Sequence, residues 1–411
     1  MPDARTVAGL VEEAHRQHWA AVLGATVRLT RDLDLAEDCT QDAYVQALRT
    51  WTDGVPDNQP AWLTTVARRS ALDRLRREAT LRRKLPLLQT DDGDDDADPP
   101  TDPLRLVFTC CHPALSTDAR VALTLRLVCG LATPEVAAAL LVKPATSAAQ
   151  ITRAKQKIAT AGIPYRVPDD EDLPERLDSV LTVVHLLYTA GHTAAGAELT
   201  RPDVEGRAVD LARLLVRLMP EQAEAQGLLA LLLMSQARGR SRVGDDGAMV
   251  LLADQDRGRW DPALVNEGVA RATAALRVGQ GRFTLQAAIA GLHSVATSWE
   301  STDWFQIVRM YDALLLQWPS PVVALNRAAA QSLVPGADLV PVLAELDRLA
   351  TDPSVRSYVY LPATRADVLA RLGRSDEARV AYDEALALTH NDRERRFLRR
   401  RRDQVAGAAA R

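Results

Sequence analysis

The chain has 411 residues, of which 47% are hydrophobic and 25% are charged, and its formal net charge is −4. This length predicts two or three domains with buried cores. The sequence shows no apolar run long enough to span a membrane and no signal peptide, which predicts a cytoplasmic protein without a membrane partner. Four cysteines without a repeated Cys-x-x-Cys spacing agree with a reducing compartment.

The small net charge hides two segments of opposite sign. Residues 68–84 hold eight cations and two acids, whereas residues 91–102 hold seven aspartates and no cation. Like charges repel and proline resists helix formation, so residues 86–103 are predicted to form a flexible acidic linker. Two interpretations stay open. The linker is a solvated spacer, or it mimics nucleic acid, either in a basic channel of a partner or over residues 68–84 of the free protein.

The first predicted elements are two helices, over residues 18–29 and 34–51. In the second helix the residues expected to face inward are Ala36, Cys39, Ala43, Ala47 and Leu48. The opposite face carries Glu37, Asp38, Gln41 and Asp42. Their helical spacing presents one polar edge, which would suit a basic helix of another protein. A solvated, acid-rich helix exterior is the alternative interpretation.

A loop over residues 54–60 leads to a third predicted helix, which carries an apolar side and a cationic side. The residues expected to face the core are Trp62, Leu63, Val66, Ala67, Leu72 and Leu75. The other side is lined by Arg69, Asp73, Arg76 and Arg77. Cations beside a partly exposed tryptophan suit the phosphates and unstacked bases of nucleic acid.

Residues 123–157 have the pattern of a helix-turn-helix. An apolar stripe stops at Gly130, which is expected to adopt a positive φ, and Thr133 with Pro134 suits the start of a short helix. The last helix is predicted from about Pro144 to Ala159 and ends in spaced cations. Such a second helix enters the major groove of DNA. An ordinary helical hairpin with a solvated basic face remains the alternative.

The run Phe108-Thr-Cys-Cys-His-Pro is the one candidate for a metal site. Adjacent cysteines rarely both reach one tetrahedral ion, and no second cluster supplies further ligands, so these residues are expected to be buried small side chains. No Ser/His/Asp order, glycine-rich phosphate loop or carboxylate pair stands out in the sequence. We therefore expect no metal, no cofactor and no enzymatic activity.

From about residue 168 helices are predicted to follow one another with a self-similarity of 34 to 36 residues. The clearest unit has small and large residues at the positions of a tetratricopeptide repeat (TPR): Ala366, Leu369, Gly373, Ala378, Tyr382, Ala385 and Leu386. Such helix pairs stack into a superhelix with a concave surface. Residues 238–262 interrupt the pattern with a group of polar and aromatic side chains: Arg242, Asp254, Gln255, Asp256, Arg257 and Trp260. This group is predicted to be either a ligand or regulatory contact, or a structural loop whose charges pair with one another.

Residues 18–78 resemble region 2 of the extracytoplasmic-function (ECF) sigma factors. The resemblance lies in Asp34-Leu-Ala-Glu-Asp-Cys-Thr-Gln-Asp and in the helix that runs from Ala61 to Arg77. It implies that Asp38, Gln41 and Asp42 dock on the clamp of the largest subunit of core RNA polymerase. It also implies that the 54–60 loop acts on the minus-10 promoter element, together with Trp62, Arg69, Asp73, Arg76 and Arg77.

The helix-turn-helix falls where region 4 of these factors belongs, which implies contacts with the minus-35 element and with the polymerase flap. The candidates for groove contacts are Thr146, Ser147, Gln150 and Arg153, and those for phosphate contacts are Lys155 and Lys157. Pro144, Ala149 and Gln150 depart from the family's pattern, so the promoter sequence is not carried over.

The whole chain resembles a subgroup of ECF sigma factors with a C-terminal TPR-like extension, whose motifs are similar to Asp254-Gln-Asp-Arg with Trp260 and to Leu325-Asn-Arg-Ala. The resemblance implies an all-α fold, regulation through an intramolecular contact of the extension with the sigma domains, and promoter DNA as a partner. We predict region 2 over 1–85, the acidic linker over 86–103, region 4 over 104–165 and the extension over 168–411, with an insertion near 238–262. Two other hypotheses remain. One is a one-component DNA-binding regulator with a TPR sensor, and the other is a TPR scaffold with a vestigial DNA-binding half.

Overall fold

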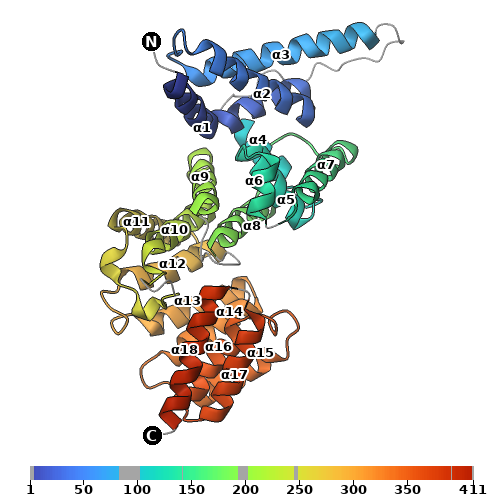
Figure 1. Ribbon diagram of the computed structural model, residues 1–411. Coiled ribbons are helices and arrows are strands. Elements are labelled where there is room, and N and C mark those ends of the chain that lie inside the picture. Colours follow the sequence, from blue (N-terminus) through green and yellow to red (C-terminus); the bar gives the residue numbers. More distant parts are fainter. Residues whose placement is uncertain are drawn as a thin grey trace. The chain divides into compact units, whose positions relative to one another are not determined.

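The computed structural model describes residues 4–82, 102–140, 142–192, 202–244, 249–389 and 391–409. Over these residues the secondary-structure elements are all helices, apart from an isolated antiparallel bridge between Val243 and Met249 (Figure 1). This confirms the all-α prediction. The chain divides into two compact units, Met1–Leu187 and Tyr188–Arg411. In the described part of the chain, no helix is both long enough and apolar enough to cross a membrane.

Three helices form a bundle at the start of the first unit: α1 (Ala4–Thr30), α2 (Leu33–Thr50) and α3 (Gln59–Arg82). The turn from α1 to α2 is set by Asp32, whose carboxylate accepts hydrogen bonds from the backbone N–H groups of Asp34 (2.8 Å) and Leu35 (3.0 Å). This is the N-cap that a helix start requires. Both predicted helices are present, but α1 begins far upstream of His18.

The bundle's core contains four of the five α2 residues that were expected to face inward, since the side chains of Ala36, Cys39, Ala43 and Ala47 are fully buried. The prediction for Leu48 was wrong, because Leu48 is 46% exposed. In α3, Leu63 and Ala67 are buried whereas Leu72 is 38% exposed, so α3 contacts the core mainly near its start.

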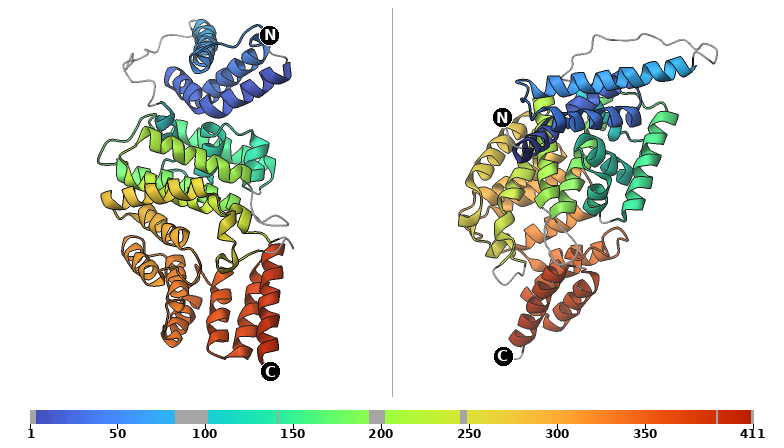
Figure 2. Two further views of the ribbon diagram at one scale, coloured as in Figure 1. Left: turned by 90° about the vertical axis from the view of Figure 1, so that its left-hand side faces the viewer. Right: turned by 45° about the horizontal axis from the view of Figure 1, so that its top comes forward.

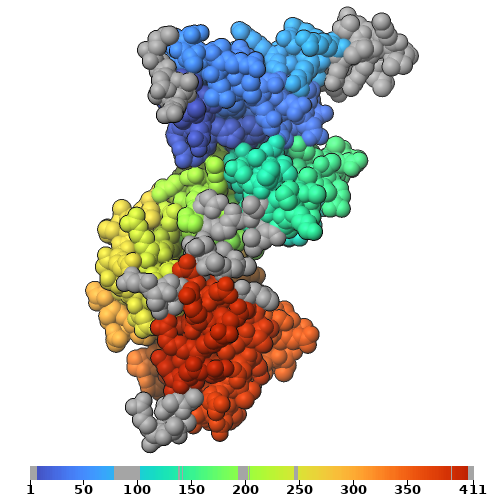
Figure 3. Space-filling view, in the orientation of Figure 1, coloured from blue at the N-terminus to red at the C-terminus, as the bar shows by residue number. Residues whose placement is uncertain are grey.

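The second group of helices in this unit comprises α4 (Asp102–Cys110), α5 (Thr117–Leu123), a π-helical turn (Thr124–Val128), α6 (Thr133–Ala139) and α7 (Pro144–Thr160). Gly130 has φ +71°, as the sequence predicted, and ends the first helix of the helix-turn-helix. The π-helical turn was not predicted. Figures 1 and 3 show this group lying against the three-helix bundle, where α4 and the π-helical turn contact α1.

The first unit extends beyond the predicted end of the DNA-binding part because α8 (Leu173–His192) begins by packing on α4 and α5. Ser179 donates a hydrogen bond to the carbonyl of Cys111 (3.0 Å) and accepts one from Arg120 (2.5 Å). Arg176 donates to the carbonyl of Phe108 (2.8 Å). The boundary between the two compact units therefore lies inside α8, after Leu187.

The second unit is a succession of helices, most of which pack on the next helix in the chain (Figure 2). They are α9 (Pro202–Leu218), α10 (Ala223–Ala237), α11 (Pro262–Val278), α12 (Arg282–Val295), α13 (Trp304–Gln317), α14 (Pro321–Ser332), α15 (Leu339–Ala350), α16 (Tyr360–Arg371), α17 (Ser375–Leu388) and α18 (Asp392–Ala409). The clearest predicted repeat corresponds to the pair α16 and α17. Its turn contains Gly373 with φ +75°, and Ala366, Leu369, Ala378 and Tyr382 lie in its core.

Three short 3₁₀ turns join α10 to α11: Gly239–Ser241, Leu252–Asp254 and Arg257–Arg259. The segment is anchored to the end of α10 by a hydrogen bond from the N–H of Asp261 to the carbonyl of Ala237 (3.1 Å). The described residues of the predicted interruption, 238–244 and 249–262, therefore form a folded connection. It lies within the second unit.

Candidate functional site

A stripe of acidic and amide side chains runs along one side of α2, and we call it the acidic stripe: Asp34, Glu37, Asp38, Gln41 and Asp42. Steps of three and four residues place all five on one helical face. The stripe has an outer edge of Asp38, Gln41 and Asp42, which are exposed, and an inner edge of Asp34 and Glu37. The outer edge consists of the three residues predicted to bind core polymerase.

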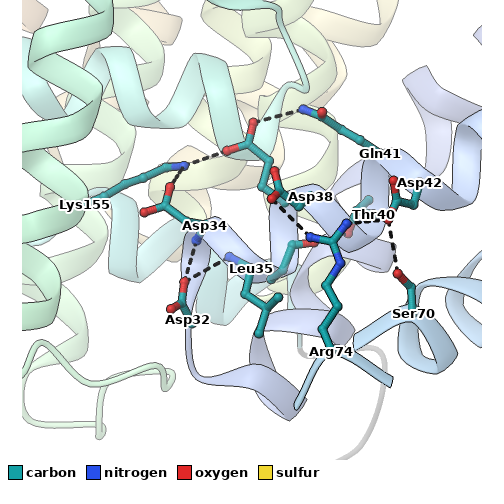
Figure 4. Close-up of polar contacts among 12 residues, drawn as sticks. Asp32, Asp34, Leu35, Asp38, Thr40, Gln41, Asp42, Ser70, Arg74 and Lys155 are labelled. Atoms are coloured by element: carbon teal, nitrogen blue, oxygen red, sulfur yellow. Dashed lines mark hydrogen bonds and ion pairs between the residues drawn. The ribbon is translucent and has the colours of Figure 1, made fainter. Parts of the chain in front are cut away.

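The outer edge is held by a cation of its own bundle, Arg74 of α3. Its guanidinium nitrogens lie 3.2 Å from the Asp38 carboxylate and 2.7 Å from that of Asp42, and Ser70 donates to Asp42 at 3.2 Å (Figure 4). The Asp38 and Asp42 side chains remain 64% and 53% exposed. Sequence reasoning missed Arg74, although its spacing of four residues from Ser70 places both on the side of α3 that faces α2.

The inner edge lies under the helix-turn-helix. One Glu37 oxygen forms an ion pair with Arg126 of the π-helical turn, and the other lies 2.7 Å from Nζ of Lys155 in α7. Lys155 also lies 2.6 Å from the Asp34 carboxylate, as Figure 4 shows. The side chains of Glu37 and Lys155 are only 6% and 10% exposed. Burial by itself lowers the pKa of Lys155, but Glu37 and Asp34 outweigh it and hold that pKa above its ordinary value.

The residues predicted to act on the minus-10 element lie on α3 and are accessible. Trp62 is half-buried and packs edge-on against the buried Trp51, with 5.8 Å between the ring centroids. The side chains of the other four predicted residues are exposed: Arg69, Asp73, Arg76 and Arg77. Just before Trp62, the side chain of Asn58 accepts a hydrogen bond from the N–H of Ala61 (3.1 Å), which fixes the entry into the helix. The helix therefore presents an aromatic ring near its start and cations along its length.

The acidic linker lies almost wholly outside the described residues. The interpretation that it covers residues 68–84 therefore falls outside the described part of the chain. Its last two residues are an exception, because Asp102 and Pro103 form the first turn of α4 and are buried. Asp102 pairs with Arg28 of α1 at 3.4 Å. Burial raises the pKa of Asp102, although the nearby arginines oppose that shift. The linker therefore ends before Asp102 and not at residue 103.

The helix-turn-helix places its six predicted DNA contacts in three different environments. Thr146, Arg153 and Lys157 are exposed, and Gln150 is half-buried. Lys155 is engaged with the acidic stripe. The prediction for Ser147 was wrong, because its side chain is fully buried, with its hydroxyl oxygen enclosed. Ser147 follows Thr146 by 100° around the helix, which turns it from the solvent to the core.

The residues of the 238–262 segment mostly bind neighbouring parts of their own unit. Arg242 donates to the carbonyl of His192 (2.9 Å), and Arg257 donates to the carbonyls of His293 (2.5 Å) and Ala296 (2.7 Å). The Arg257 guanidinium also lies 4.8 Å from the centroid of the buried Trp260 ring. The remaining predicted residues divide into Asp254 and Asp256, which are exposed, and Gln255, which bonds the carbonyl of Val250.

The two adjacent cysteines lie at the end of α4 and are buried, as expected of small core residues. Burial raises the pKa of both thiols, that of Cys111 to about 11. Within the part of the chain that the structure describes, no group of three or more His, Cys, Asp or Glu residues is arranged to hold a metal ion. The cysteines thus contribute to packing at the end of α4.

Three family models match the chain in the order of its structural parts. Residues 14–80 match Sigma-70 region 2, and residues 105–158 match Sigma-70 region 4. Residues 176–276 match a family of unknown function. The first two matches coincide with the three-helix bundle and with α4 to α7.

Two related proteins match different shares of the chain. An uncharacterized protein of Rhizobium meliloti (strain 1021) is 40% identical over 401 residues, which are 94% of each protein. The probable ECF RNA polymerase sigma factor SigI of Mycobacterium tuberculosis is 30% identical over 158 residues. That match covers 36% of this chain and 54% of SigI. The match to the Rhizobium meliloti protein therefore extends into the second unit, whereas the match to SigI covers a shorter part of the chain.

Proposed function

The chain belongs to the ECF family of RNA polymerase sigma factors and carries a C-terminal extension, and we propose that it docks on core polymerase through the outer edge of its acidic stripe. Its family gives it a role in promoter recognition, with core RNA polymerase and promoter DNA as partners. Sigma factors do not catalyse a reaction themselves.

The outer edge suits a basic partner because its carboxylates are exposed and already arranged. Arg74 holds Asp38 and Asp42 side by side without burying them. An incoming cationic surface on the polymerase clamp would compete with Arg74 for the same oxygens. Complementary charge of this kind speeds association and selects the partner.

The cationic face of α3 is proposed to act on the minus-10 element, and the observation that carries this proposal is the exposure of Arg69, Arg76 and Arg77 on the helix that begins beside Trp62. Removing a base from the duplex costs a few kcal/mol. Stacking on an aromatic ring returns roughly 1–3 kcal/mol per base, and the cations hold the phosphates. Trp62 and these cations together meet both requirements of promoter melting.

We propose that α7 reads the minus-35 element with Thr146, Gln150 and Arg153, while Lys157 contacts phosphate. These side chains lie on the second helix of a helix-turn-helix whose Gly130 turn has the expected geometry. Lys155 joins them only when it leaves the acidic stripe. The flap of core polymerase is the proposed protein partner of this part.

The extension is proposed to regulate the sigma domains through its TPR-like helical pairs and through the 238–262 segment. Support comes from the exposed carboxylate of Asp254. Asp256 is also exposed, but its carboxylate caps the 3₁₀ turn Arg257–Arg259 by accepting a hydrogen bond from the N–H of Gly258 (2.9 Å). Exposed acids suit a cationic partner surface. The sigma domains supply such a surface on α3.

Binding to core polymerase tests the docking proposal. In a fluorescence titration of the full-length protein, we expect the double variant Asp38→Ala, Asp42→Ala to lose affinity for core at least about tenfold. The matched control Glu12→Ala removes an exposed acid of α1 in the same three-helix bundle and should bind as the wild type does. Unchanged core binding by the double variant would overturn the proposed docking surface.

A further inference from the structure

The two edges of the acidic stripe have cationic partners from different parts of the chain. The outer edge is bound by Arg74, which lies in the same three-helix bundle. The inner edge is bound by Arg126 and Lys155, which lie in the helix-turn-helix, 89 and 118 residues beyond Glu37 in the chain. One continuous surface of α2 therefore carries the predicted polymerase-docking edge and also contacts the helix-turn-helix.

Glu37 is the centre of the inner contact. One oxygen of its carboxylate forms an ion pair with Arg126 and accepts a hydrogen bond from the side chain of Gln41 at 3.3 Å. The other oxygen accepts a hydrogen bond from Nζ of Lys155 at 2.7 Å. A carboxylate this deeply buried is stable only while its cationic partners remain, because an unpaired buried charge is strongly disfavoured. Separating the helix-turn-helix from α2 must therefore expose Glu37 to water or supply new cations.

Packing around this ion cluster gives the contact a specific shape. The indole Nε1 of Trp19 in α1 donates to the carbonyl of Leu127 at 2.9 Å, at the end of the π-helical turn. Gly130 lies so close to α1 that a Cβ at this position would meet Cε1 of His15 at 2.7 Å. A buried donor, a glycine and an enclosed ion cluster together mark a fitted interface and not a loose encounter.

Lys155 links this interface to DNA binding. Its neighbours on α7, Arg153 and Lys157, are exposed, whereas the Lys155 ammonium is enclosed between Asp34 and Glu37. A cation held by two carboxylates cannot neutralise a phosphate at the same time. Contact with the acidic stripe and a phosphate contact of Lys155 are therefore mutually exclusive.

We infer that the helix-turn-helix closes on the inner edge of the acidic stripe in the free protein, and that Lys155 exchanges Glu37 and Asp34 for a DNA phosphate when the two parts separate. The inference rests on the proposed function, because it assigns regulation to the same polymerase and DNA surfaces. Docking of core polymerase beside the inner edge favours opening, and opening releases Lys155. Core binding and minus-35 binding thus reinforce each other.

Spin-label distances in the full-length protein test the closed state directly. Labels at Gln46 in α2 and Gln156 in α7, both exposed, are placed in a Cys129→Ser background. The wild type should give one narrow distance distribution, and Glu37→Gln should broaden it toward longer distances. The matched control Asp42→Asn removes an acid that pairs within the bundle, and it should leave the distribution narrow. An unchanged distribution in Glu37→Gln would overturn the inference.

Duplex DNA binding by the free protein separates the closed state from the exchange of Lys155. We expect Glu37→Gln to bind duplex DNA about tenfold more tightly, because binding no longer requires the closed state to open. Adding Lys155→Gln should remove that gain, whereas Lys155→Arg alone should behave as the wild type. Equal affinity of the wild type and Glu37→Gln would contradict the exchange.

These measurements use no polymerase, so their outcome is independent of whether the outer edge docks on core. If the distances respond as expected while the Asp38→Ala, Asp42→Ala variant still binds core, the closed state stands and the docking surface is wrong. If the distances do not respond while that variant loses core binding, the docking surface stands and the closed state is wrong. Circular dichroism of each variant shows whether its helices are retained.

Discussion

Gly130 allows the contact between the helix-turn-helix and the three-helix bundle to be perturbed by one methyl group. Its φ of +71° disfavours any residue with a Cβ, and that Cβ would lie 2.7 Å from His15 Cε1 and 2.9 Å from Trp19 Cγ. We expect Gly130→Ala to lower the free energy of unfolding of this unit by about 1 kcal/mol through the backbone conformation. The steric overlap should cost a further ~1–3 kcal/mol.

A second glycine isolates the backbone contribution. Gly162, which follows α7, has φ +60° and open space where a Cβ would lie. Gly162→Ala should therefore cost about 1 kcal/mol, without a steric contribution. Hydrogen exchange of the amides of α5 and α6 across a urea series measures both variants on the unit that contains them.

The difference between the two glycine variants reports the fitted contact with α1. Adding His15→Ala to Gly130→Ala should recover part of the steric cost, because it removes the atom that the new Cβ meets first. If Gly130→Ala costs no more than Gly162→Ala, the close packing of the helix-turn-helix on α1 is not present in solution. The helix-turn-helix would then not be held against α1 and α2 in the free protein.

Three further predictions test single side chains. Arg74→Ala removes largely exposed ion pairs, so urea titration should show a change in unfolding free energy below ~1 kcal/mol. Stopped-flow mixing with core should meanwhile show faster association, because two acids of α2 are unmasked; slower association would contradict this. Ser147→Ala should leave duplex DNA affinity unchanged, since the hydroxyl is buried, and a large loss in a binding titration would restore it as a groove contact. Burial and nearby arginines lower the pKa of His293 to about 4. The unfolded chain therefore binds this proton at higher pH than the folded protein, and stability falls as the pH drops from about 6.5 to 4. In thermal denaturation His293→Gln should weaken that dependence, and an identical pH profile would refute it.

The local features of this protein were readable from its sequence because they depend on neighbouring residues. Gly130 ends a helix with a positive φ, and the row Ala36, Cys39, Ala43 is buried, as the helical period requires. Ala47 continues this row and is buried, whereas Leu48 lies 100° further around the helix and is exposed. The helical period, applied strictly, therefore excludes Leu48 from the buried row.

The inner contact was out of reach of the sequence because it joins residues that are far apart in the chain. Glu37 and Lys155 are separated by 118 positions in the chain. The helix face around each of them has the polar composition that is expected of a solvated surface. Their pairing follows from how α4 and the π-helical turn pack on α1. The prediction for Ser147 failed because a shift of one residue along α7 turns a side chain by 100°, from the exposed face to the core.

The most direct test of the account is run-off transcription with purified core RNA polymerase and the full-length protein, on promoter fragments captured by the complex. We expect core alone to make no specific product, and we expect core with the protein to start transcription at one position. A regulator that only binds duplex DNA would not give this result. Absence of any specific product, while a control sigma factor initiates on its own promoter, would contradict a role of this protein in promoter-specific initiation.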